Sequence, residues 1–303
     1  MDQGRYRLPG GLVDSDGNLH RQVKLAQLSG HEEEFLAAYA ASGNAALVTY
    51  LLGCCLLNIG EIRPVSEDIA RSLLIADRQY LLLKLYEITF GPHVQATITC
   101  PRLACGERFD LDFMIDDVPI RPLQDKGPCY HMQLSQEAAF DDEGHEYQRE
   151  IVFRLPNGAD QEAIEPVLFG GGSEAQAAIL LLARCIQATS PAAEPGVEYV
   201  GRLSPQARQE IEKQMEEMAP QVDLMMEGSC PECSLPFAIP LDIAGLLLRR
   251  LQTSLDTLYR ETHYLAYHYH WSEQEIMAMS RPKRRHYIHI LAEEIERLNH
   301  ALA

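Results

Sequence analysis

Two pairs of cysteines, about 125 residues apart, constrain the fold of this 303-residue chain more than any other feature. The first pair is Cys100 and Cys105 in CPRLACG, and the second is Cys230 and Cys233 in CPEC. Each pair lies between segments in which apolar and polar residues alternate, as they do in half-buried strands. Two such turns can bring four thiolates to one ion, which is the donor set of a tetrahedral structural Zn²⁺ site. We therefore expect one shared zinc site, with the chain between the pairs leaving and returning as an insertion.

Three other interpretations of the cysteine pairs remain open. They are two reduced pairs without a metal, one pair retained as a relic, and a redox Cys-x-x-Cys. A redox pair lies between a strand and a helix, whereas Cys233 precedes the alternating segment FAIPLDI. Four protein thiolates leave no open coordination position, so the zinc site would stabilise structure and would not catalyse. The remaining cysteines are expected to be buried inert thiols: Cys54, Cys55, Cys129 and Cys185.

The charge balance bears on the partners that the chain can bind. It has 44 acidic against 26 basic residues, a formal net charge of −18. That field repels a phosphate backbone and disfavours general nucleic-acid binding. The most apolar run, 45–59, is shorter than the roughly 20 residues that cross a membrane. The first residues contain no apolar stretch typical of a secretory signal. We expect no membrane span and a cytoplasmic location, where thiols stay reduced.

Hydrophobic periodicity predicts an α+β fold that is mainly helical, with a small antiparallel β region carrying a split four-cysteine zinc-ribbon-like site. Asp16-Gly17 predicts a tight turn in an N-terminal hairpin. Ser66 is the expected N-cap of a helix that runs to about residue 90. The predicted division is an N-terminal β-hairpin (1–30), a helical core (31–92), a β region with the first cysteine pair (93–155), a helical insertion (156–220), a β region with the second pair (221–243) and a C-terminal helical arm (244–303).

The C-terminal arm combines aromatic and basic side chains, the usual anchors of protein interfaces. We expect a partner to contact Tyr264, Tyr267, Tyr269, Trp271, Arg281, Arg284 and Arg285. The alternative is that the arginines lie at the start of a helix and are simply exposed to solvent. His263, His268 and His270 lie in the same segment, but residues two apart do not share a helix face. An aromatic helix end is therefore favoured over a metal site there.

The sequence lacks the patterns that indicate common catalytic sites. No Lys-Ser or Lys-Thr follows Gly170-Gly171-Gly172, so these glycines are not a P-loop and are expected to form a flexible joint. Neither Gly-x-Ser-x-Gly nor His-Glu-x-x-His occurs. We expect a protein that is not an enzyme. A hydrolase that uses His268, His270 and nearby acids is the weaker alternative.

Several segments resemble the baseplate hub assembly chaperones of T-even phages and their relatives in contractile tail and extracellular contractile injection system clusters. They are LPGGLVDSDGNLHRQVKLAQLSGHEEE, IGEIRPVSEDIARSLLIADRQYLLLKLYEITFG and both cysteine turns. The most telling run is Asp77-Arg78-x-Tyr80, leading to Phe90-Gly91 and then to Cys100-Pro. The four residues between Cys100 and Cys105 depart from the two-residue gap that is common in the family.

The resemblance implies a non-enzymatic assembly factor or structural component of the baseplate hub, with hub and spike proteins as partners. It would act in the cytoplasm of the producing cell, and retention in the finished particle stays open. The runner-up is a zinc-ribbon adaptor that binds nucleic acid or transcription machinery, which the negative charge disfavours.

Overall fold

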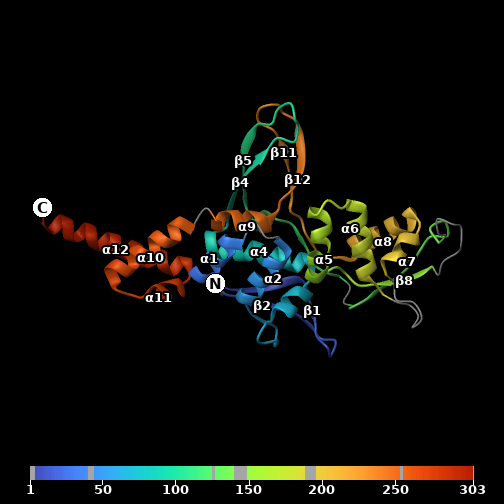
Figure 1. Cartoon of the computed structure of the whole chain (residues 1–303), viewed down its shortest axis with the longest axis horizontal. Helices are drawn as coiled ribbons and strands as arrows, with labels where there is room; N and C mark the ends of the chain where they lie inside the picture. The colour runs from blue at the N-terminus through green and yellow to red at the C-terminus, as the bar shows by residue number, and fades with distance from the viewer. Residues whose placement is uncertain are drawn as a thin grey trace.

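The computed structural model describes residues 4–39, 44–124, 127–139, 149–187, 196–252 and 255–302. The predicted fold class is confirmed, because helices dominate and the sheets are small and antiparallel. Figure 1 shows a central body from which two β-hairpins project side by side. A second helical unit lies on one side of the body and the C-terminal helices lie on the other.

A three-stranded sheet begins the central body. It consists of β1 (Arg5–Val13), β2 (Leu19–Leu25) and β3 (Leu56–Ile59) in the order β1-β2-β3. The predicted first hairpin is confirmed. Its turn is held by the Asp14 carboxylate, which accepts hydrogen bonds from the backbone of Asp16 and Asn18, and Gly17 supplies a φ of +82°.

The predicted helical core at 31–92 is wrong at β3, which is a strand. The segment LLNI adds to the edge of β2 and buries Leu56 and Ile59. Its four residues show no clear hydrophobic period. They form a strand because they pair with β2, which lies more than 30 residues earlier in the chain. Tertiary pairing therefore decides the local structure there.

Five helices complete the body: α1 (Gly30–Tyr39), α2 (Asn44–Cys55), α3 (Glu67–Ser72), α4 (Ile75–Phe90) and α9 (Ile243–Gln252). Their core brings together segments that lie far apart in the chain, since Leu36, Leu81 and Leu247 belong to one buried cluster. Ser66 caps α3 as predicted. The expected single helix is interrupted at Leu73 and Leu74, both extended, and Leu74 forms a β-bridge with Asn157 of the insertion.

The insertion forms a unit with its own core. Its strands are β7 (Tyr130–Gln133), β8 (Glu150–Phe153) and β9 (Ile186–Gln187), and its helices are α5 (Gly158–Phe169), α6 (Glu174–Cys185), α7 (Val197–Arg202) and α8 (Pro205–Met218). Phe153, Leu182 and Ile211 lie in this second core. The predicted β region 93–155 is therefore divided, because β7 and β8 pack with the insertion rather than with the first cysteine pair.

The chain enters and leaves the insertion at one place. β6 (Ile120–Arg121) follows a short 3₁₀ turn, Ile115–Asp117, and pairs antiparallel with β10 (Gln221–Val222). Arg121 extends this junction, since its guanidinium donates to the carbonyls that end α8, including Glu216 O at 3.0 Å. The insertion that the distant cysteine pairs required thus leaves and returns through adjacent strands.

The two projecting hairpins are β4 (His93–Thr99) with β5 (Arg108–Met114), and β11 (Met225–Ser229) with β12 (Pro236–Pro240). The C-terminal helices are α10 (Leu255–Tyr269), α11 (Glu273–Met277) and α12 (Arg281–Leu302). Ser272 and Glu275 form a capping box at the start of α11. Within the described residues, no helix combines the length and apolar character needed to cross a membrane.

Candidate metal centre

The four predicted cysteines meet where the tips of the two hairpins come together. Cys100 Sγ lies 3.7 Å from Cys233 Sγ, and Cys105 Sγ lies 3.9 Å from Cys230 Sγ. All four sulfurs lie within 4.8 Å of one another. Four sulfurs at about 2.3 Å from a tetrahedral zinc are about 3.8 Å apart, whereas a disulfide needs about 2.0 Å. The spacing fits a shared cation, and the predicted convergence of the two pairs is confirmed.

The two turns are built alike although the first is two residues longer. Cys100 N–H donates to Glu107 O at 2.8 Å, and Cys230 N–H donates to Leu235 O at 2.9 Å, so each hairpin closes just below its sulfurs. The residue after the second cysteine of each pair has a positive φ, +59° at Gly106 and +56° at Ser234. The longer turn extends outward at Leu103, which is fully exposed. The unusual gap therefore does not separate the thiols.

The sulfurs lie in unequal surroundings. Cys100 and Cys230 are buried, and Cys105 and Cys233 are partly exposed. Burial raises the pKa of Cys100, whereas a backbone hydrogen bond from Leu235 lowers the pKa of Cys233. A divalent cation favours the thiolate at every position, because metal binding releases the thiol protons.

An aromatic contact joins the hairpins below the sulfurs. The rings of Phe109 and Phe237 lie 5.4 Å apart between the two hairpins. Gly228 makes room for this contact, since a Cβ there would lie 2.9 Å from the Phe237 ring. The hairpins reach the main core at their bases, through Val94 and Ala96 of the first and through Leu224 and Leu241, which flank the second. A cation between the tips would supply the cross-link that this small interface lacks.

Among the described residues, the other cysteines and histidines do not form a second centre. In the described part of the chain, the four cysteines are the one group of three or more candidate ligands that lie within reach of a common ion. Cys55 and Cys185 are buried, as expected for inert thiols. The expectation is wrong for Cys54, which is exposed, and Cys129 is partly exposed.

Two of the predicted partner-binding arginines are turned inward. Arg284 Nη2 lies 2.7 Å from Glu33 Oε1, and Arg284 Nε lies 3.3 Å from Glu261 Oε2. Arg281 Nη1 lies 3.5 Å from Glu33 Oε2. Both arginines are buried, so the expectation that they face a partner is corrected: they attach the arm to the body. Arg285 is 57% exposed.

The predicted aromatic residues lie along α10 and the turn after it. The rings of Tyr269 and Trp271 stack with centroids 4.6 Å apart, and Tyr287 of α12 meets the Trp271 ring edge-on at 5.0 Å. Tyr264 packs against His268 at 4.7 Å. Tyr267 is 69% exposed. The histidines of this segment thus belong to an aromatic helix end, as the sequence favours.

Asp77, in the most telling run of the family resemblance, has a structural role. Asp77 accepts hydrogen bonds from Gly10 N–H at 2.7 Å and Gly11 N–H at 2.8 Å, where the register of β1 is irregular. Burial raises its pKa to about 6. The carboxylate therefore compensates backbone donors that the irregular strand leaves unpaired.

Arg78, the next residue, points to the other side of α4. Its guanidinium donates to Thr49 Oγ1 and Ala70 O, each at 3.0 Å, and to Ala45 O at 2.9 Å. The side chain is 1% exposed, and burial lowers its pKa to about 10. Arg78 thus connects α2, α3 and α4. The family resemblance marked the run as distinctive, but it could not assign these contacts.

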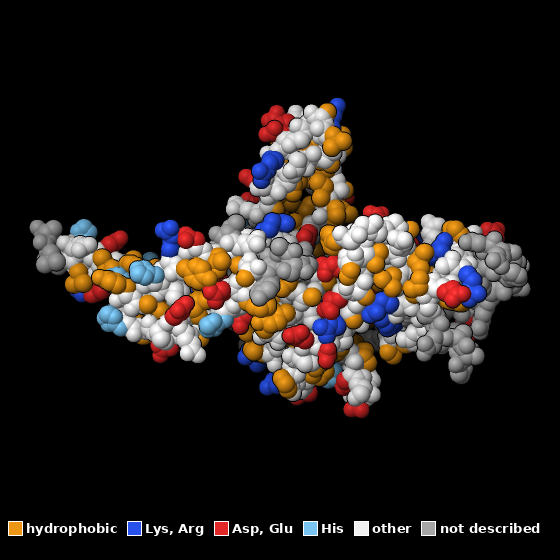
Figure 2. Space-filling model, viewed as in Figure 1, with side chains coloured by type: hydrophobic (Ala, Val, Ile, Leu, Met, Phe, Trp, Pro, Cys, Tyr) orange, Lys and Arg blue, Asp and Glu red, His pale blue; other side chains and the backbone are white. Residues whose placement is uncertain are grey.

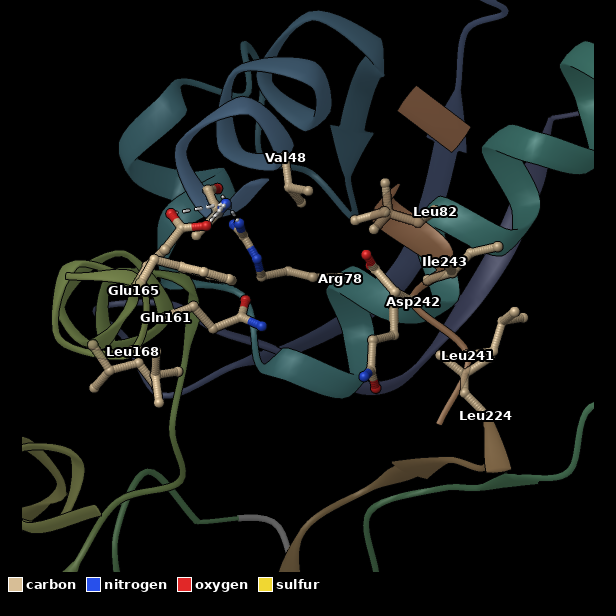
Figure 3. A pocket seen from close by; sticks show the side chains of 15 residues that line it. Val48, Arg78, Leu82, Gln161, Glu165, Leu168, Leu224, Leu241, Asp242 and Ile243 are labelled. Carbon is tan, nitrogen blue, oxygen red and sulfur yellow. Dashed lines mark hydrogen bonds between the residues drawn. The ribbon is translucent and has the colours of Figure 1, made fainter. Parts of the chain in front are cut away.

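A pocket of about 320 Å³ lies between the body and the insertion, beside Arg78. Figure 3 shows side chains from α4, α5 and the chain before α9 around it, with Glu165 bonded to the body. Both Glu165 oxygens accept from Ala45 N–H at 3.2 Å. Arg78 and Glu165 both form hydrogen bonds with backbone atoms of the body. The pocket is therefore part of the contact between the body and the insertion.

Comparison with known families assigns the chain. A family model described as T4 bacteriophage base plate protein matches residues 20–236. No curated protein and no solved structure matches the chain. The matched range contains most of the body, the whole insertion and all four clustered cysteines, and α10, α11 and α12 lie beyond it. The match covers well over half of the 303 residues, and the chain therefore belongs to the family of T4 bacteriophage base plate proteins.

Proposed function

We propose that this protein is a non-enzymatic assembly factor or structural component of the baseplate hub in a contractile phage tail or contractile injection system. The observation that carries the proposal is the family match, which extends through the body, the insertion and the cysteine cluster. A baseplate protein acts by holding other subunits, and elements that project from a packed body are suited to that role.

The cysteine cluster supports this role as a structural centre. Zn²⁺ would be held by Cys100, Cys105, Cys230 and Cys233, which fit it in number, chemistry and spacing. The ion would supply no reaction, because four thiolates fill its coordination positions. With the ion bound, the four cysteines would hold the two hairpin tips together as one rigid projection.

The arm is the proposed contact surface for hub or spike subunits, with the N-terminal hairpin as a second. Tyr264, Tyr267, Tyr269 and Trp271 provide aromatic anchors, and Arg285 provides a partly exposed charge. Arg281 and Arg284 support these anchors by fixing the arm to α1. A rigidly attached arm loses less conformational freedom when a partner binds.

The charge of the hairpins favours a protein partner over nucleic acid. Strands and turns together contain two basic residues, Arg102 and Arg108. They contain five acidic residues: Glu107, Asp110, Asp112, Glu227 and Glu232. A zinc-ribbon adaptor for nucleic acid would need the opposite balance and would bind in a salt-dependent manner. A DNA or RNA mobility shift that weakens with salt would favour that adaptor instead.

The experiment is co-purification from bacterial cells that express the tagged chain together with the neighbouring tail or injection-system genes. We expect hub or spike proteins to co-purify from the cytoplasmic fraction, and analysis of finished particles decides whether the chain is retained. Tyr267→Ala should reduce the yield of partner. Lys213→Ala is the matched control, because Lys213 on α8 is also largely exposed (74%) but lies in the insertion. Absence of every baseplate and spike protein from the eluate would contradict the proposal.

A further inference from the structure

The last helix, α12, presents one continuous face with heptad spacing. Its apolar members are Ile288, Leu291, Ile295 and Leu298, separated alternately by three and four residues. The same face continues toward the start of the helix at Arg284 and Arg281, with the same spacing. We call Ile288, Leu291, Ile295 and Leu298 the α12 seam. Alternating Ile and Leu at this spacing is typical of a coiled-coil interface.

Among the described residues, burial of this face decreases along the helix: Arg281 and Arg284 are buried, Ile288, Leu291 and Ile295 are half-buried, and Leu298 is exposed. Glu33 of α1 and Glu261 of α10 pair with the arginines there. Tyr287 makes the next contacts, with the rings of Tyr269 and Trp271. Beyond it the helix extends to the far end of the molecule, past α10 and α11 (Figure 1).

The distal half of α12 leaves apolar side chains partly exposed. No described apolar residue of α12 belongs to either core, and Leu298 is 49% exposed. Hydrophobic side chains are visible on this arm in the space-filling view (Figure 2). A face that is covered at one end and apolar at the open end is suited to a second helix.

We propose that a second copy of this chain covers the α12 seam, with the two α12 helices antiparallel. An identical helix supplies an identical seam, so the surface is self-complementary. In the antiparallel register, Ile288 packs against the partner's Leu298 and Leu291 packs against the partner's Ile295. Each layer then combines one isoleucine with one leucine.

The body excludes the parallel arrangement. In a parallel pair the two Arg284 side chains would face one another across the seam, but α1 and α10 already occupy that face. The antiparallel arrangement puts the two bodies at opposite ends. It brings the two Glu294 side chains near each other beside the seam, and each is neutralised by Arg297 of its own helix, with Nε–Oε2 at 3.0 Å.

The inference is independent of the hub function. The seam lies outside the family match at 20–236, so the pairing would be a property of this chain's arm. Four seam side chains per helix make a small interface, and we expect a weak dimer. Pairing would strengthen wherever an assembly brings two copies close together.

Analytical ultracentrifugation of the full chain, from about 1 to 200 µM, tests the proposal. We expect the wild type to pass from monomer to dimer and Leu298→Glu to weaken dimerisation at least tenfold. Ile290→Glu is the matched control, because Ile290 is also apolar and exposed (42%) but lies off the seam. It should dimerise like the wild type, and circular dichroism should be the same for all three. A wild type that stays monomeric throughout, or equal loss in both variants, overturns the proposal.

Mixing experiments test the orientation. Glu294→Lys places a lysine opposite Glu294 of a wild-type partner only in the antiparallel pair, so a mixture should form more heterodimer than random pairing gives. In a parallel pair Glu294 would face Asn299, which is uncharged, and the mixture would pair at random. Random pairing would overturn the antiparallel arrangement.

Discussion

Arg284 of the last helix and Glu33 of the first helix form a buried ion pair, with Nη2 and Oε1 2.7 Å apart. The two residues are 251 positions apart in the chain, and each side chain is at most 3% exposed. Glu261 of α10 shares the same guanidinium. These buried charges therefore help to attach the arm to the body, together with the β-bridge between Ser29 and Ser280 and the close packing of Met277 against Gly30.

Replacement of Arg284 should detach the arm. Arg284→Met leaves Glu33 and Glu261 buried with reduced charge compensation, and loss of one partner from a buried pair costs about 3–5 kcal/mol. We expect faster amide hydrogen exchange in α11 and α12, with the central body little changed. Arg285→Ala is the control, since Arg285 is 57% exposed and its pair should contribute less than about 1 kcal/mol. Equal exchange rates in the two variants would contradict this role.

A second prediction concerns the contact between Arg78 and the start of α5. A Cβ added at Gly158 would lie 2.3 Å from Arg78 Nη1 and 2.8 Å from Arg71 O. Gly158→Ala should therefore displace the guanidinium and cost about 1–3 kcal/mol in the free energy of unfolding, measured by urea denaturation.

Gly201→Ala provides the control for that measurement. A Cβ at Gly201, within α7, meets nothing within 4 Å. The substitution should be neutral or stabilising by up to about 1 kcal/mol, because alanine reduces the conformational freedom of the unfolded chain. If Gly158→Ala were as stable as Gly201→Ala, the close packing at Arg78 would not matter.

Local signals in the sequence predicted the features that depend on neighbouring residues. Ser66 caps a helix as expected, because a cap is satisfied within three residues. The cysteine turns were predictable for the same reason, since each closes over a few residues. Their meeting also followed, because two thiolates alone cannot complete a four-ligand site.

The features that were missed depend on distant partners. β3 is a strand because β2 is beside it, and the helix break at Leu73–Leu74 accompanies a bridge to Asn157. Arg281 and Arg284 looked like surface residues, since a basic cluster at a helix start is normally solvated. Their burial required Glu33 and Glu261, which no spacing rule connects to them.

Acid should weaken the insertion through Asp160. Burial acts to raise the pKa of Asp160, but hydrogen bonds from Arg154, the backbone of Asn157 and Arg184 lower it below its usual value overall. The folded state then binds fewer protons than the unfolded state. The stabilisation is present above the unfolded pKa of about 4 and is lost as pH falls through the folded pKa.

Asp160→Asn tests this pH dependence. The variant should be less stable near neutral pH, because Arg154 and Arg184 lose their shared carboxylate. Its unfolding free energy should also change less between about pH 5 and pH 2 than that of the wild type. Asp256→Asn is the control, since the Asp256–Arg260 pair is about 80% exposed. If the unfolding free energy of Asp160→Asn changed with pH as much as that of the wild type, Asp160 would not be the source of the pH dependence.

Removal of the metal should loosen the hairpins and leave the rest of the fold intact. We expect about one zinc per purified chain, measured by atomic spectroscopy, because the four sulfurs form one closed donor set. Cys230→Ser should lose the ion, and limited proteolysis should then cut near the hairpin tips. The far-UV circular dichroism should barely change, since the clustered sulfurs belong to neither core.

Cys54→Ser is the matched control, because that thiol is exposed and lies outside the cluster. Zinc that persists in Cys230→Ser, or that is lost in His268→Ala, would assign the ion to another site.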